Sequence, residues 1–299
     1  MTILDTRPGP AADTTRTLPR RSRGGAWRRG AVVVLATLLG ALLIGALLFS
    51  LAGGRWFVIS TPSMAEAAPV GTLVLTVPVP AEDIRAGDII TFHPPTAPDQ
   101  TYTHRVRALT AAGGILSRGD LNGADDPWTL TGGDLVGKSI AAVPGLGWLV
   151  RALPILVPGI AGLWILTGRF VPLGRRIPLR IVGVPLVISV ATVILRPFIG
   201  ISVLAAGMTE GTPRATVVST GVLPISVHAG GGEPAHLTAG SVGQVPLPSL
   251  NGSDHYQMAS ALDLPPSGWV LLMLICALPL LWSLAVSLPG PVKNRSTGT

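Results

Sequence analysis

The chain has 299 residues, of which 12% are charged and 48% are hydrophobic, and its mean hydropathy is +0.55. The charged fraction is about half that of an ordinary globular protein, which argues against a cytosolic protein, and the apolar content is too high for a disordered chain. We therefore expect a protein that crosses a membrane several times.

The net charge of +7 raises the question of nucleic-acid binding. The basic residues lie mostly at the flanks of apolar segments, as membrane topology requires, so we expect contact with a lipid bilayer and no nucleic-acid partner. The single cysteine, Cys276, lies in an apolar stretch. It can form neither an intramolecular disulfide nor a cysteine metal cluster, and we expect no metal and no other cofactor.

The N-terminal residues predict a tail followed by a membrane anchor. Residues 1–30 are rich in arginine and lack apolar periodicity, which predicts a disordered basic tail. Residues 31–52 carry no charge and are numerous enough to cross a hydrocarbon core of about 30 Å as a helix. A cleaved signal peptide is the alternative, but its apolar part would span only about 7–15 residues, so we expect an uncleaved anchor.

The middle of the chain alternates between polar and apolar character. Residues 53–143 combine polar turns with alternating apolar and polar residues, which predicts a β-rich domain. Two shorter apolar segments follow, residues 144–168 and 181–204, and we expect both to cross the membrane. The basic stretch between them, residues 169–180, predicts a cytoplasmic loop.

The C-terminal part repeats this pattern. Residues 205–266 form a second polar segment with strand-like alternation, and residues 267–288 are a further apolar span before a basic tail, residues 289–299. The positive-inside rule then puts the basic segments and both termini in the cytoplasm of a multi-pass cell-membrane protein; only Arg196 would lie near the outer interface. The expected fold is a β-rich extracytoplasmic domain anchored by about four transmembrane helices, with a second small β-like extracytoplasmic segment.

A serine lies just after the first predicted span, in Ser60-Thr-Pro-Ser-Met64. A serine in a loop is by itself an ordinary turn residue. Here, however, it opens an ordered series of short segments: Pro69-Val-Gly71, residues 85–92, Thr103-His-Arg-Val106, Arg118-Gly-Asp-Leu-Asn122, Asp125-Asp-Pro-Trp128, Val136-Gly-Lys138 and Pro144-Gly-Leu-Gly147.

This series resembles the type I signal peptidases, in particular the branch of the endoplasmic reticulum, archaea and some Gram-positive bacteria, over residues 30–150. The resemblance implies a membrane-bound serine endopeptidase that removes signal peptides from exported preproteins after small residues. It implies three catalytic residues, with Ser63 as nucleophile, His104 as general base and Asp126 as orienting acid, and Asp120 as a second important carboxylate. For the oxyanion and the substrate, it implies Thr61, Ser63 and Met64.

The residues themselves also favour a histidine base. A lysine base must be desolvated to be neutral, yet Lys138 follows the acidic motif and Lys293 lies in the predicted cytoplasmic tail. Of the two histidines in the first polar domain, His93 precedes two prolines where the chain turns, whereas His104 lies in an alternating run that a strand would hold rigidly. The sequence leaves open whether Asp126 or Asp120 pairs with His104.

The chain departs from the family directly after Met64, because Ala65-Glu-Ala-Ala68 stands where the family usually has Glu-Pro-Thr or a similar sequence. The catalytic side chains are all present, so we expect an active enzyme with a reshaped cleft and a narrower range of substrates. The alternative is a catalytically inactive homologue that binds or assembles exported proteins. A small-molecule transporter fits less well, because the apolar segments carry no matched repeats.

The resemblance does not extend to residues 205–266, and we hypothesise that they guide a dedicated substrate. Asn251-Gly-Ser253 fits a glycosylation acceptor. The spacing of the ionisable residues is irregular and predicts surface positions, not a metal site: His228, Glu233, His236, Asp254 and His255. Expected partners are exported preproteins and the bilayer; the sequence identifies no accessory subunit.

Overall fold

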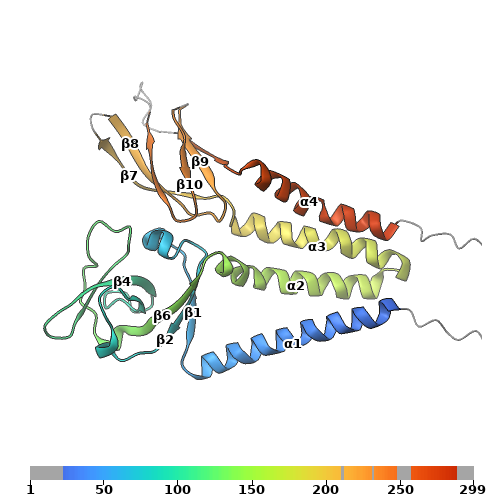
Figure 1. The fold of residues 1–299 in the computed structure, drawn as a ribbon, viewed down its shortest axis with the longest axis horizontal. Coiled ribbons are helices and arrows are strands. Elements are labelled where there is room, and N and C mark those ends of the chain that lie inside the picture. The colour runs from blue at the N-terminus through green and yellow to red at the C-terminus, as the bar shows by residue number, and fades with distance from the viewer. Residues whose placement is uncertain (1–22, 210–211, 231, 248–256, 288–299) are drawn as a thin grey trace, which may run out of the picture. The chain divides into compact units, whose positions relative to one another are not determined.

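The computed structural model describes residues 23–209, 212–230, 232–247 and 257–287 (Figure 1). The chain divides into two units, residues 1–52 and 53–299. The first unit contributes helix α1 (Arg23–Leu51). This helix begins inside the predicted tail, because no proline separates residues 23–30 from the apolar run that follows. Most of that tail and the whole C-terminal tail lie outside the described residues.

Three helices are long and apolar enough to cross a membrane: residues 30–51 of α1, α2 (Leu146–Phe170) and α3 (Leu173–Leu195). Their large apolar side chains are mostly exposed on the protein surface, as lipid-facing residues would be. The coarse expectation of a β-rich protein with membrane-associated helices is thereby confirmed. Helix α4 (Pro266–Ser287) occupies the fourth predicted span, and its described side chains, to Leu281, form a shorter apolar stretch.

The first β-rich part is one antiparallel six-stranded sheet in the order β1-β2-β6-β3-β4-β5. Its strands are β1 (Arg55–Val58), β2 (Leu73–Val77), β3 (Ile89–Phe92), β4 (Tyr102–Leu109), β5 (Ile115–Arg118) and β6 (Leu135–Val143). Alternation along these strands sends one set of side chains into two buried clusters. The larger cluster contains Ile84, Ile90, Phe92, Val106, Ile115 and Leu130.

Helices α2 and α3 pack against each other as a hairpin (Figure 1). Here the structure differs from the predicted basic loop of residues 169–180 and the predicted span of residues 181–204. Helix α3 already begins at Leu173, because arginine is compatible with a helix. In addition, Arg180 contacts α2: its guanidinium lies 4.1 Å from the centre of the Trp164 ring. The helix ends before Arg196, whose φ of 48° leaves the helical region.

The second β-rich part consists of two three-stranded sheets, β10-β9-β12 and β11-β8-β7. Their strands are β7 (Ile201–Thr209), β8 (Thr212–Ser219), β9 (Ile225–Ala229), β10 (Ala235–Leu237), β11 (Val242–Pro246) and β12 (Met258–Leu262). Residues from both sheets share one buried core, so this part, which we call the sandwich, has a hydrophobic interior of its own. Strand β7 starts inside the predicted third span, since residues 201–203 pair with β8.

Among the described residues, no group of three or more His, Cys, Asp and Glu could hold a metal ion. In the sandwich, His236 pairs with Asp263 (Nδ1 to Oδ2, 2.6 Å) on the surface. The predicted glycosylation acceptor at Asn251, together with Asp254 and His255, lies outside the described residues.

Two glycines let α2 and α3 approach closely. A Cβ at Gly159 of α2 would lie 2.6 Å from Cγ1 of Val187, and one at Gly183 of α3 would lie 2.6 Å from Cδ1 of Leu163. A Cβ at Gly162, also on α2, would meet no atom within 4 Å. The contact between the helices therefore depends on the absence of side chains at particular positions.

We expect Gly159→Val to lower the thermal stability of the detergent-solubilised protein, because overpacking such a contact costs about 1–3 kcal/mol. Gly162→Val is the matched control: it changes the helix propensity of α2 equally but adds a side chain in open space. Thermal unfolding followed by circular dichroism measures both variants. Equal losses in the two variants would contradict close packing at Gly159.

Candidate active site

Ser63 lies in a short turn that follows the first strand of the sheet. The chain stays extended through Ile59, whose N–H donates to the Thr72 carbonyl (2.9 Å), before the 3-10 turn η1 (Pro62–Ala67). The next side chain, Met64, is fully buried in a cluster with Ile59, Ala68 and Val74. Met64 therefore anchors the turn, because burying its side chain stabilises the fold by about 1.5–3 kcal/mol, and its implied role in substrate binding stays a prediction.

The turn also contains an unusual backbone conformation. Ala65 has φ 50° and ψ −136°, which a residue with a Cβ adopts only at a cost of about 1–3 kcal/mol. On the other side of Met64, the Ser63 carbonyl accepts a hydrogen bond from the Leu121 N–H (2.8 Å). Ser63 is thus fixed by tertiary contacts and not by a regular element.

His104 is held rigidly in the middle of the sheet. It lies on β4 opposite Ile90 of β3, and only 4% of its surface is exposed. Its ring makes edge contacts with Phe92 and Tyr102, at centroid distances of 6.1 and 5.6 Å. These aromatic contacts restrict the rotation of the imidazole ring.

Asp126 lies on the loop that follows β5 and is held by Ser117 in that strand. The Asp126 N–H donates to the Ser117 carbonyl (2.8 Å), and the Ser117 hydroxyl donates to Oδ2 of Asp126 (2.5 Å). Sequence reasoning missed Ser117. A polar residue at an inward position of an alternating strand is the signal that could have found it, since Ile115 and Ser117 face the same side.

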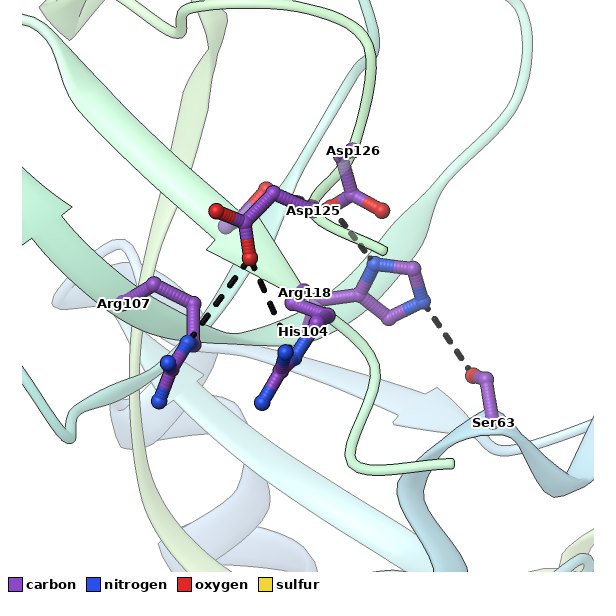
Figure 2. A network of polar contacts seen from close by, with 7 residues as sticks. Ser63, His104, Arg107, Arg118, Asp125 and Asp126 are labelled. Carbon is purple, nitrogen blue, oxygen red and sulfur yellow. Dashed lines mark hydrogen bonds and ion pairs between the residues drawn. The ribbon is translucent and has the colours of Figure 1, made fainter. Parts of the chain in front are cut away.

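The three side chains line up (Figure 2). His104 Nδ1 lies 2.8 Å from Asp126 Oδ2, and His104 Nε2 lies 3.2 Å from Ser63 Oγ. An ionised carboxylate only accepts hydrogen bonds, so Nδ1 carries the proton and Nε2 presents its lone pair to the Ser63 hydroxyl. This is the tautomer that a general base for serine requires.

The other two carboxylates of this region point elsewhere. Asp120 does not reach His104; it forms a two-pronged ion pair with Arg105, with distances of 2.9 and 2.7 Å, and this hydrogen bonding raises the pKa of the Arg105 guanidinium. Asp125 lies 3.7 Å from Arg107 and 3.9 Å from Arg118 on the exposed side of the loop (Figure 2). The structure thus pairs His104 with Asp126 and makes Asp120 a positioning residue next to Leu121.

A groove of about 350 Å³ opens beside the serine. One side comes from residues 57–61, at and beyond the end of β1, and the other from residues 100–104 of β4 and the loop before it. Thr61 lines this groove and makes no capping hydrogen bond to η1. Its implied role towards the oxyanion stays a prediction.

The two other candidate bases lie apart from Ser63. His93 donates from Nδ1 to the Gln100 carbonyl (2.9 Å) and so fixes the loop between β3 and β4. The Nζ of Lys138 lies 2.7 Å from Oδ1 of Asp88 in an ion pair. The His93 imidazole is thus engaged with a loop carbonyl and the Lys138 ammonium with a carboxylate, so each side chain has a structural role.

No protein-family model matches the chain, and a search of curated proteins finds no match either. The chemistry of the site therefore rests on its own geometry: a hydroxyl, an imidazole and a carboxylate aligned at hydrogen-bond distance, beside an open groove. Such an arrangement can activate a serine for attack on a carbonyl carbon.

The ion pair of Asp88 with Lys138 predicts an acid-dependent loss of stability. Burial raises the pKa of the Asp88 carboxyl, but hydrogen bonds from the Lys138 side chain and the Arg85 N–H, with the charges of both residues, hold it below its ordinary value of 3.8. The ionised carboxylate therefore stabilises the fold above about pH 4, and this contribution is lost as the pH falls through the lowered folded-state pKa.

We expect Asp88→Asn to lower the free energy of unfolding at pH 7, and the difference from wild type to vanish once the pH lies below the lowered folded-state pKa of Asp88. Chemical denaturation between pH 7 and pH 2 measures it. Asp99→Asn, which removes an exposed carboxylate on the loop between β3 and β4, is the control. The same pH-dependent difference in the control would show that the Asp88 ion pair is not its source.

Proposed function

We propose that this chain is a membrane-bound serine endopeptidase that removes signal peptides from exported preproteins after small residues. The observation that carries the proposal is the alignment of Ser63, His104 and Asp126 within hydrogen-bond distance. The order of the sequence motifs supplies the substrate class, through the resemblance to type I signal peptidases.

The mechanism follows from this alignment. His104 Nε2 removes the hydroxyl proton of Ser63 as Oγ attacks the scissile carbonyl carbon, forming a tetrahedral intermediate. The imidazolium then donates that proton to the leaving amine, and water hydrolyses the acyl-enzyme with His104 again as base. Asp126 holds the imidazole orientation and stabilises its positive charge, while the Ser63 N–H and the Thr61 hydroxyl are the candidate donors to the oxyanion.

The groove beside Ser63 suits an extended peptide. Residues 102–104 of β4 pair with β3 on one side, whereas the ladder with β5 begins only at Arg105. Strand β1 is an edge strand of the sheet. A substrate strand can therefore run between these two segments and hydrogen-bond to their backbones, which brings its scissile bond to Ser63.

Membrane attachment adds to catalysis in this proposal. The sheet is joined to apolar helices at both of its ends along the chain, α1 before β1 and α2 after β6. A preprotein whose signal sequence lies in the bilayer is then a tethered substrate with a raised local concentration. We propose four spans, with both termini in the cytoplasm and the sheet and the sandwich outside.

Three substitutions test the catalytic role. We expect Ser63→Ala, His104→Ala and Asp126→Asn each to reduce cleavage of preproteins by about 10³-fold or more, because each removes a part of one catalytic unit. The purified proteins are reconstituted in liposomes with a panel of preproteins from the same genome, and mass spectrometry locates the cut.

Asp125→Asn is the matched control, since this neighbouring carboxylate faces Arg107 and Arg118 instead of His104. It is expected to cleave at the wild-type rate. Undiminished cleavage by Ser63→Ala would reject the proposal. Binding of preproteins without any cleavage by wild type would favour the inactive module that binds or assembles exported proteins.

The orientation is tested by labelling intact cells with a membrane-impermeant maleimide, in protein with Cys276→Ser. We expect Asp99→Cys in the sheet domain and Gly207→Cys in the sandwich to react from outside, and Gly174→Cys in the first turn of α3 to react only after permeabilisation. All three positions are exposed on the protein. Labelling of Gly174→Cys in intact cells would reverse the proposed topology.

A further inference from the structure

The turn that carries the nucleophile is contacted by the sandwich. The backbone of Gly240, between β10 and β11, lies so close to Ala65 that an added Cβ would come within 2.5 Å of the Ala65 carbonyl oxygen and 3.0 Å of Cγ of Pro69. Strand β8 also contacts η1. The sandwich therefore packs against the peptide unit that follows Ala65, a residue two positions beyond Ser63.

This contact falls on the strained part of the turn. The φ of 50° and ψ of −136° at Ala65 are not stabilised by a regular helix, because η1 is interrupted at this residue. Before it, the Ser63 carbonyl is held by the Leu121 N–H and the Met64 side chain by the buried cluster. After it, the Gly240 backbone lies so close to the Ala65 carbonyl group that a Cβ at Gly240 would be 2.5 Å from its oxygen and 2.8 Å from its carbon.

The sandwich side of the contact is itself rigid. The Ser241 N–H donates to the Thr238 carbonyl (3.0 Å), and the Thr238 N–H donates to the Ser241 hydroxyl (2.8 Å), which closes a tight turn. The Gly240 N–H donates to the Ser219 carbonyl (3.0 Å) at the end of β8. Gly240 has φ +77°, so this turn and the close approach both require glycine.

The contact also coincides with the departure from the signal-peptidase pattern. The residues that differ are 65–68, and the sandwich contacts the first of them. The turn at residues 238–241 approaches Ala65 and Pro69, while the Ala68 side chain is buried in the cluster with Met64. The altered segment and the added sandwich are thus two sides of one interface.

We propose that the sandwich is a clamp on the nucleophile turn and that Gly240 is a positioning residue, which keeps Ala65 strained and thereby sets Ser63 Oγ against His104 Nε2. The consequence for the reaction rests on the proposed function. This role of the sandwich differs from guiding a dedicated substrate. A clamp affects every substrate equally, because it changes the rate of the chemical step.

Gly240→Ala tests the clamp. It is expected to lower kcat for preprotein cleavage by about tenfold or more, because small displacements of a nucleophile are costly, while KM stays within about twofold, since the groove residues are untouched. The matched control is Gly113→Ala: this glycine has φ +80°, but a Cβ there meets nothing within 4 Å. The two variants carry the same backbone penalty, and only one alters the Ala65 contact.

Two further variants separate positioning from a general loss of stability. Gly240→Asn tolerates the positive φ better than alanine but still places a Cβ against Ala65, so it is expected to fold and to retain the kcat defect. Ala65→Gly, added to Gly240→Ala, lets the strained peptide unit adapt and is expected to restore at least part of kcat. A kcat loss no larger than that of Gly113→Ala, or no recovery with Ala65→Gly, would overturn the clamp.

A second readout needs no peptidase activity. In protein with Ser63→Cys and Cys276→Ser, the only thiol lies at position 63, and its alkylation by iodoacetamide reports the local geometry at His104. Gly240→Ala is expected to change the alkylation rate by about fivefold or more, and Gly113→Ala to leave it unchanged. If wild type cleaves no preprotein, the proposed function fails. The alkylation rate still tests the clamp in that case, because an unchanged rate in Gly240→Ala rejects it.

Discussion

The hydrogen bond between the Asp126 carboxylate and His104 Nδ1 is the interaction on which the site depends. Both side chains are about 5% exposed, so the carboxylate has lost most of its water and needs protein donors. It finds them in His104 and in the Ser117 hydroxyl. Because the bond determines which imidazole nitrogen carries the proton, it also determines that the lone pair faces Ser63.

The sheet carries two of the hydrogen-bonded groups, His104 and Ser117, and it fixes the third, Asp126. His104 lies on β4 and pairs with Ile90 of β3, while Ser117 of β5 pairs with Val106, two residues after His104 on the same strand; the Asp126 N–H bonds back to Ser117. The ion pair of Arg105 with Asp120 joins the same strand to the loop whose Leu121 N–H holds the Ser63 carbonyl. His104, Asp126 and Ser63 are thus tied to a common scaffold, as a preorganised site requires.

The nucleophile turn differs from the rest of the site, because it belongs to no regular element. It is stabilised by Met64 in the core, by Leu121 on the loop after β5 and by the Gly240 turn of the sandwich. The sandwich thus contacts the strained segment beside Ser63, the turn at Ala65. The apolar helices between the two parts are the remaining connection along the chain.

The sequence by itself determined the features that depend on composition and local pattern. Long uncharged runs identified the apolar helices, alternation identified the β-rich parts, and motif order singled out Ser63 and His104. Only the tertiary structure decided between Asp126 and Asp120, because the two carboxylates are close in sequence and their pairing depends on which way the loop after β5 turns. The burial of Met64, the support from Ser117, the start of α3 at Leu173 and the contact of Gly240 with Ala65 were likewise decided by packing between residues that are distant in the chain, which local pattern does not encode.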